Sequence, residues 1–256
     1  FIQENGKFFD RSFQYGFDKT NGWYNVIDTG DFNQDGFVDF VAGNHGLNSR
    51  FKASTAEPVA MIVNDFDQNG SIEQIITRYD HGVSYPMVLK QDLVIQIPSL
   101  KKKYLHFRDY KEKTIADIFS KDQLKDAYTL KAYTFETTVW LNNGNGTFSK
   151  RDLPIQAQFA PVYALLVDDF TGDGVLDILI GGNLLRAKPE TGIYAGSHGL
   201  LLKGDSKGNF SSIPADESGL SIQGEIRSFR KISSKGKKFV LVGKNNDRIQ
   251  VLGNKM

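Results

Sequence analysis

Three nine-residue stretches constrain the possible fold more than any other feature of this chain. They begin at Asp31, Asp65 and Asp169, and each places oxygen-bearing side chains at positions one, three, five and nine and a glycine at position six. A hard cation needs this alternation when one tight loop wraps around it, and calcium accepts several oxygen ligands at about 2.3 to 2.6 Å with flexible geometry. The glycine permits the positive φ that a sharp bend requires. The pattern therefore predicts three calcium-binding loops.

The predicted ligands are the four side chains and the carbonyl group of position seven, so the chain would hold up to three structural Ca2+ ions. They are Asp31, Asn33, Asp35, Phe37 and Asp39 in the first loop, Asp65, Asp67, Asn69, Ser71 and Glu73 in the second, and Asp169, Thr171, Asp173, Val175 and Asp177 in the third. The alternative is that the Asp and Asn side chains form hydrogen-bonded turns without metal. Three carboxylates crowded into nine residues would repel one another without a cation, which favours metal binding.

The residues on either side of the loops indicate β-hairpins. An EF-hand would place its bidentate glutamate at position twelve, between two helices. Here the last acid is at position nine, and β-forming residues precede the loops, as in Val26-Ile27 before the first and Leu165-Leu166-Val167 before the third. Each loop is therefore predicted to connect two antiparallel strands.

Turn sequences recur along the chain, because Asn5-Gly6, Asn145-Gly146 and Gly208-Asn209 each lie close to apolar runs. Asn-Gly between such runs is a strong hairpin signal, since the turn that suits twisted strands needs positive φ. Gly146 and Gly208 are 62 residues apart, and a period of about 60 residues with four short strands is typical of propeller blades. The repeat around the third loop is predicted to have strands at 163–168, 176–181, 199–203 and 209–213.

The fold class predicted from these repeats is all-β, with about four β-propeller blades that form part of a larger propeller. Shifting the third repeat by 62 residues aligns Gly174 with Gly236 and places Lys231, Ser233, Lys235 and Phe239 at the ligand positions. Because two lysines would occupy the space of a cation, this fourth hairpin is predicted to bind no calcium.

The second loop has two possible assignments, because Asp65 follows Asp31 by only 34 residues. That spacing is too short for a full four-stranded blade. Either the first blade is abbreviated, or residues 59–63 and 72–77 are its third and fourth strands.

Residues 88–135 are predicted to form a small helical insertion. Leu93, Ile97, Leu100 and Tyr104 follow a helical spacing that Pro98 interrupts. A later helix is indicated by the capping box that runs from Ser120 to Gln123. The lysines at 101–103 have two interpretations, either a patch for an anionic ligand or a solvated helix face.

The three loops resemble those of VCBS/FG-GAP-type repeat proteins, whose calcium-binding β-propeller blades occur in integrin α-subunit heads and in many secreted bacterial proteins. Bacterial surface proteins with such repeats are the closer likeness, and the resemblance covers nearly the whole chain apart from about residues 88–135. The resemblance implies an extracellular, periplasmic or cell-surface location and a non-enzymatic binding module for a protein or glycan partner. Only about four blades of about 60 residues can be counted, so residues 1–256 are expected to form one partial propeller whose missing blades lie upstream, with open edges that permit self-association.

Strand direction suggests where a partner would bind. Consecutive antiparallel strands exit at alternate ends of a blade, so the loop after each metal-loop hairpin lies opposite the calcium. The segments 44–58, 79 through the helical insertion, and 183–198 meet this condition. They include the predicted partner-binding residues His45, Arg50, Lys52, Arg186, Lys188 and Tyr194, which suit an anionic or carbohydrate ligand. The alternative is that these segments only cover the mouth of the propeller.

Other functions find little support in the sequence. There is no His-Glu-x-x-His motif, Gly-x-Ser-x-Gly elbow or phosphate-binding Gly-Lys-Ser/Thr loop, so no enzyme is expected. A propeller-fold glycan hydrolase or lyase with carboxylates from distant blades is the alternative. No aromatic-basic motif indicates nucleic-acid binding, and no apolar run reaches the roughly 18 residues of a membrane span. The 256 residues are 40% hydrophobic, which excludes a disordered chain.

Overall fold

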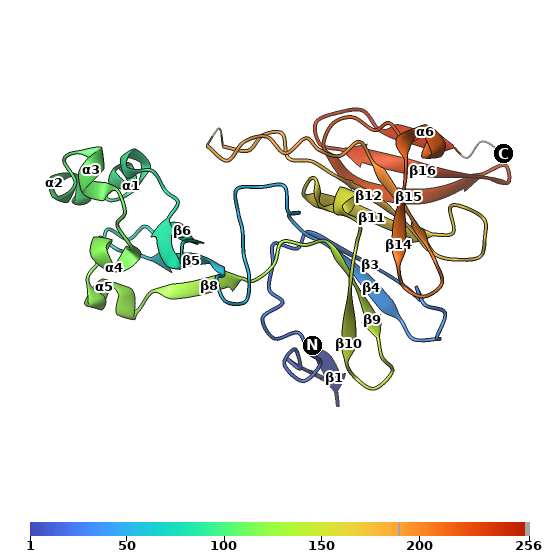
Figure 1. Ribbon diagram of the computed structural model, residues 1–256, viewed down its shortest axis with the longest axis horizontal. Helices are drawn as coiled ribbons and strands as arrows, with labels where there is room; N and C mark the ends of the chain where they lie inside the picture. Colours follow the sequence, from blue (N-terminus) through green and yellow to red (C-terminus); the bar gives the residue numbers. More distant parts are fainter. Residues whose placement is uncertain (189, 254–256) are drawn as a thin grey trace. The chain divides into compact units, whose positions relative to one another are not determined.

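The computed structural model describes residues 1–188 and 190–253, which form mostly antiparallel β-sheets with short helices (Figure 1). The chain divides into two compact units. Of the described residues, the first unit contains 1–18, 22–50, 135–188 and 190–253, and the second contains 19–21 and 51–134. The second unit is therefore an insertion in the sequence of the first.

The first unit contains an N-terminal hairpin and three larger sheets. The hairpin consists of β1 (Ile2–Glu4) and β2 (Lys7–Phe9). The first sheet has the order β10-β9-β4-β3, with β3 (Val26–Gly30), β4 (Asp39–Gly43), β9 (Thr138–Asn142) and β10 (Phe148–Asp152). The second has β11 (Val162–Asp168), β12 (Asp177–Gly182), β13 (Leu200–Gly204) and β14 (Phe210–Ile213) in sequence order. The third has β15 (Ile226–Ser234), β16 (Lys237–Lys244) and β17 (Gln250–Gly253). Two short helices connect the sheets: η1 (Ile155–Gln158) lies between β10 and β11, and α6 (Ala215–Ser218) lies between β14 and β15.

The predicted strands and turns of the repeats are confirmed. The four strands predicted around the third loop correspond to β11, β12, β13 and β14, with boundaries that differ by at most one residue. The fourth repeat is a hairpin in which β15 and β16 pair directly across Lys235 and Gly236, both with positive φ. A two-residue turn replaces the acidic loop there, so the strands extend further than in the other repeats.

The sheets of the first unit pack in succession through their apolar faces. Their first strands are neighbours, because β3 contacts β11 and β11 contacts β15. Val41 of the first sheet and Ile178 of the second lie in one core, whereas Leu179 and Phe229 lie in the core between the second and third sheets. Alternate residues of β12 thus enter opposite cores, which explains why all of its residues are buried.

The second unit combines one sheet with five short helices. The sheet has the order β7-β6-β5-β8, with β5 (Val59–Asn64), β6 (Glu73–Asp80), β7 (Val83–Pro86) and β8 (Tyr128–Ala132). The helices are α1 (Lys90–Gln96), α2 (Leu100–Lys103), α3 (Phe107–Tyr110), α4 (Ile115–Ile118) and α5 (Lys121–Lys125). Leu93 of α1 and the residues that directly follow α1 and α4, Ile97 and Phe119, share a core with Phe66 and Ile75 of the β5–β6 hairpin. No helix within the described residues is long and apolar enough to cross a membrane.

Both assignments considered for the second loop are wrong. The first sheet is completed by β9 and β10, since Phe40 of β4 pairs with Trp140 of β9. Strands β5 and β6 instead form their own sheet, in which β8 pairs with β5 on the side away from β6. The segment predicted to be helical through residue 135 is helical only through Lys125, because the residues from Tyr128 to Ala132 form this edge strand.

No closed propeller is formed by the part of the chain that the structure describes. In the first unit β1 pairs with β2, and β17 pairs with β16. Strand β17 is consequently an edge strand, and self-association through such edges stays a prediction.

Candidate metal loops

The three acidic loops share one hydrogen-bond frame. In each loop the carboxylate at position one accepts backbone N–H groups of positions five and six, and the side chain at position five accepts the N–H of position seven. These nine bonds measure between 2.7 and 3.1 Å. Side chain to backbone bonds of this kind set the loop shape locally, as in Asx turns. The repeated sequence pattern is thus a repeated three-dimensional structure.

Two positions of each loop adopt a left-handed backbone. The predicted one is position six, where Gly36, Gly70 and Gly174 have φ values of 87°, 88° and 81°. The second is position four, where Gln34 and Gln68 have φ values of 59° and 58°, and the third loop has a glycine. Position four carries no common residue type in the three loops, so the sequence pattern did not reveal it.

In the first unit the acid at position nine is buried, and its side chain hydrogen-bonds to a neighbouring strand. Asp39 is 0% exposed, and its Oδ2 accepts the N–H of Phe32 at 2.8 Å while Oδ1 accepts the N–H of Asn142, on β9, at 2.7 Å. Asp177, also 0% exposed, accepts the N–H of Gly204 on β13 at 3.1 Å. Burial raises the pKa of the Asp39 carboxyl, although the two N–H groups partly oppose this shift. Position nine therefore joins the metal-loop hairpin to the third strand of its sheet.

The second loop has the arrangement that best fits a cation. Ligand atoms of Asp65, Asp67 and Glu73 lie within 4.8 Å of one another, and no other such acidic group occurs among residues 1–188 and 190–253. The Oδ1 atom of Asp67 is buried and accepts no hydrogen bond within the described chain. A buried carboxylate oxygen without a partner is unfavourable unless an ion or another polar group satisfies it. These three residues could hold a divalent cation with oxygen preference.

The helical segment anchors the second loop. The ring of Phe66 stacks on Phe119, with 4.0 Å between centroids, and the Phe66 carbonyl accepts the Nε2–H of Gln123 at 2.6 Å. Gln123 also accepts the N–H of Ser120 at 2.9 Å, which confirms the predicted capping box of α5. One side chain therefore caps a helix and holds the metal loop.

This anchoring corrects the predicted position of the helical segment. The segment from residue 79 through the helices was expected at the end of its sheet opposite the calcium, whereas α5 contacts the second loop itself. The reason is the two-residue turn of His81 and Gly82, both with positive φ, which returns β7 toward the loop before the helices begin.

In the first and third loops, donor side chains contact one of the carboxylates. Asp173 forms an ion pair with Lys203 at 2.8 Å, which lowers the pKa of Asp173 and raises that of Lys203. In the first loop Asn33 donates to Asp35 at 2.8 Å. The two loops are also neighbours, because the amide of Gln34 donates to the carbonyl of Gly174 at 3.1 Å.

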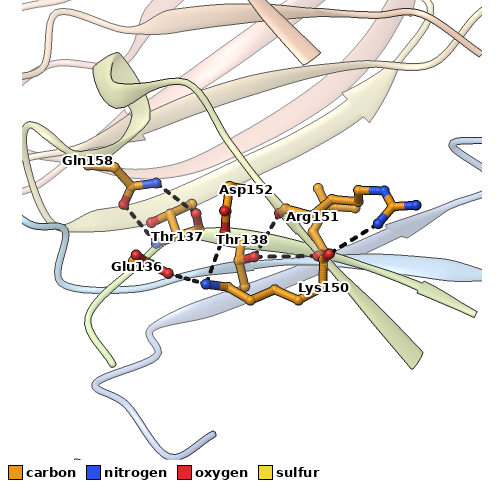
Figure 2. Close-up of polar contacts among 8 residues, drawn as sticks. Glu136, Thr137, Thr138, Lys150, Arg151, Asp152 and Gln158 are labelled. Carbon is orange, nitrogen blue, oxygen red and sulfur yellow. Dashed lines mark hydrogen bonds and ion pairs between the residues drawn. The ribbon is translucent and has the colours of Figure 1, made fainter. Parts of the chain in front are cut away.

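Buried amides hold the loops at the other end of the sheets. Figure 2 shows Gln158, whose amide accepts the N–H of Thr137 at 2.9 Å and donates to its carbonyl at 2.8 Å. Nearby, Lys150 forms ion pairs with Glu136 and Asp152. The hydroxyl of Thr137 then accepts the N–H of Asn44 at 3.0 Å. The chain that leaves β4 is thereby attached to the beginning of β9.

Asn44 and Asn183 have equivalent roles that the sequence prediction missed. Each is the first residue after the second strand of its sheet, and they are 0% and 3% exposed. Asn183 exchanges hydrogen bonds with the backbone of Ser197 at 2.7 and 2.8 Å, and the side chain of Asn44 accepts the N–H of Trp23 at 2.9 Å. The signal was present in the sequence, since each of these strands ends in a glycine that an asparagine follows directly.

Of the predicted partner-binding residues, His45 and Tyr194 are buried. They are 8% and 6% exposed, and their rings lie 4.9 Å apart between centroids. Burial lowers the pKa of His45 to about 4. Arg50 is half-buried and donates to the carbonyl of Glu190 at 2.6 Å. The two loops therefore pack on each other through residues that were predicted to face a partner.

The remaining predicted cations are exposed. Arg186 and Lys188 lie on the loop after β12, in the first unit, whereas Lys52 belongs to the second unit. The partner surface that the first unit can offer from this set is therefore reduced to Arg186 and Lys188.

No protein-family model matches this chain, and a search of curated proteins finds no significant match. A functional assignment consequently depends on the loops and sheets described above.

Proposed function

We propose that this chain is a non-enzymatic, calcium-stabilised β-propeller module of a secreted or cell-surface protein, similar to VCBS/FG-GAP-type repeats. The observation that carries the proposal is the second loop, where ligand atoms of Asp65, Asp67 and Glu73 lie within 4.8 Å of one another and one buried oxygen of Asp67 has no hydrogen-bond partner among the described residues. The same backbone frame in the other two loops supports the relation among them. Calcium would have a structural role, because it would bind only the folded loops.

The arrangement of the first unit supports propeller blades. In two of its sheets an acidic loop joins the first strand to the second, and the first strands β3, β11 and β15 follow one another as neighbours. Successive sheets also bury apolar faces against each other. Radially repeated sheets in a propeller pack in this way.

The partner would bind at the loops opposite the acidic loops of the first unit. Hydrogen bonds of Asn44, Asn183 and Gln158 fix the backbone where these loops begin, so the exposed loop residues are carried by an ordered scaffold. Arg186 and Lys188 are exposed there and suit an acidic protein segment or an acidic glycan.

Asp67→Asn is expected to destabilise the protein in calcium but not in chelator. With excess calcium the variant should be less stable than the parent by about 2 to 3 kcal/mol, since a ligand at about a hundred times its Kd stabilises a fold by roughly this amount. In chelator it should be as stable or more stable, because the substitution removes a charge from a cluster of three carboxylates. Thermal melts in the two buffers measure both effects.

The control for this experiment is Asp126→Asn, which changes an exposed acid in the same unit. It should leave the calcium-dependent shift in Tm unchanged. A parent protein whose Tm is the same in calcium and chelator would contradict the structural role of calcium.

Arg186→Ala combined with Lys188→Ala is expected to weaken retention on acidic glycans or acidic peptides by about tenfold, as loss of two charge contacts at a rim does. Immobilised-ligand binding measures this, with Lys207→Ala and Lys235→Ala as the control pair of exposed cations. Unchanged retention of the first pair would place the partner surface elsewhere, and turnover of the glycan would favour a hydrolase or lyase.

A further inference from the structure

The turn between α2 and α3 exposes two large apolar side chains. Leu105 is 69% exposed and Phe107 is 66% exposed, although Tyr104 beside them is 3% exposed and packs in the core of the second unit. Single exposed apolar residues are common on protein surfaces. Two of them at one turn, separated only by the exposed His106, form an apolar tip, which we define as residues 105–107.

The apolar tip is held in a fixed conformation. The ammonium group of Lys90 donates to the carbonyl of Leu105 at 2.9 Å and lies 5.2 Å from the centre of the Phe107 ring. The carboxylate of Asp109 accepts the N–H of His106 at 2.8 Å, at the start of α3. Because these bonds order the turn in advance, binding through Leu105 and Phe107 would lose little conformational entropy.

Cations surround the apolar tip. The stretch 100–113 has six lysine or arginine residues and two acids, which leaves a net charge of +4. Both acids are already engaged, since Asp109 binds the backbone of His106 and Glu112 forms an ion pair with Lys111 at 3.0 Å. Lys101, Lys102 and Arg108 are exposed on the same stretch. Lys103 instead donates to carbonyls at the end of α4 and has a structural role.

Exposed apolar side chains beside several cations fit an anionic lipid surface better than they fit a nucleic acid or an acidic protein. Apolar side chains at an exposed turn can enter the boundary between headgroups and acyl chains, while neighbouring lysines and arginines contact anionic headgroups. A nucleic acid would satisfy the cations but offers no apolar phase for Leu105. An acidic protein would need an apolar groove that accepts both Leu105 and Phe107.

We propose that the second unit binds the surface of an anionic membrane through Leu105 and Phe107, with Lys101, Lys102 and Arg108 on the lipid headgroups. This role is separate from calcium binding and from the partner surface of the first unit. On this proposal Lys101 and Lys102 would contact an anionic ligand, whereas Lys103 has a structural role.

Vesicle flotation of the full chain tests the proposal. The protein should float with phosphatidylcholine vesicles that contain about 30% phosphatidylserine and remain unbound with pure phosphatidylcholine, because each basic residue gains from the anionic surface. Leu105→Ser with Phe107→Ser should reduce the bound fraction at least about tenfold. Lys101→Ala with Lys102→Ala should reduce it to a similar degree, and about 0.5 M salt should weaken binding of the parent.

Arg248→Ala with Ile249→Ser is the matched control, since it removes an exposed cation and an apolar side chain that is 69% exposed from the first unit. All variants should keep the parent Tm, because the changed side chains are exposed. Equal binding to neutral and anionic vesicles, no binding to either, or binding that the tip variants retain would overturn the proposal. Loss of oligonucleotide binding in the tip variants, without any lipid binding, would assign the surface to nucleic acid instead.

Discussion

Asp39→Ala is expected to lower the free energy of unfolding by about 3 to 5 kcal/mol, because it leaves the buried N–H of Phe32 and the partly buried N–H of Asn142 without acceptors. The carboxylate is 0% exposed and accepts the N–H of Phe32 at 2.8 Å and that of Asn142 at 2.7 Å. Each unsatisfied donor destabilises the fold by roughly 1 to 3 kcal/mol, and the lost side-chain volume adds to this. Urea denaturation measures the change.

Two comparisons distinguish the loss of the Asp39 hydrogen bonds from the loss of a calcium ligand. Asp39→Asn keeps one acceptor oxygen and should lose about half as much stability, while Asp18→Ala, at an exposed acid, should change it by less than about 0.5 kcal/mol. The loss in Asp39→Ala should be similar in calcium and in chelator. A loss that appears only in calcium would mean that Asp39 acts mainly as a metal ligand.

Gly182→Ala is expected to destabilise the protein by about 3 kcal/mol or more, since a methyl group at this position has no space. A Cβ there would lie 1.8 Å from the carbonyl oxygen of Pro161, a backbone atom that cannot rotate away. That oxygen also accepts the N–H of Asn183 at 3.1 Å, so moving it would disturb the loop that follows β12. The close approach coincides with the register shift between β11 and β12 at Val162.

Gly253→Ala is the control for this substitution. Among the residues that the structure describes, its Cβ would meet only the ring of Phe239, at 3.4 Å, which is close to ordinary van der Waals contact with a movable side chain. Alanine should therefore change stability there by less than about 1 kcal/mol. Equal denaturation midpoints for Gly182→Ala and the parent would show that the two strands can separate without loss of packing.

The acidic loops, the hairpins and the strands of the third repeat could be predicted from the sequence because each depends on neighbouring residues. The carboxylate at position one binds N–H groups four and five residues away. The turn at Lys235 and Gly236 needs only two residues with positive φ. Patterns of this range are visible in a sequence without knowledge of its fold.

The division of the chain could not be predicted in the same way. Strand β4 ends at Gly43 and pairs with β9, which begins at Thr138, across the whole inserted second unit. No local pattern specifies which of two later β-forming segments, β5 or β9, will pair with β4, because both are apolar and of similar length. The choice is made by the packing of the sheets, which places Val139 of β9 in the core with Val41 and Ile178.

The sequence alone identified the three acidic loops and their carboxylates. The tertiary structure decided how deeply each carboxylate is buried and which groups it pairs with. All three loops contain three carboxylates, yet Lys203 of β13 pairs with an acid in the third loop, while a buried Asp67 oxygen in the second finds no partner in the part of the chain that the structure describes. Likewise His45 and Tyr194 had the composition of a binding surface, but they pack together because the loops after β4 and β12 meet. Local hydrogen bonds form the loops, whereas burial and neighbouring charge depend on strands that are distant in sequence.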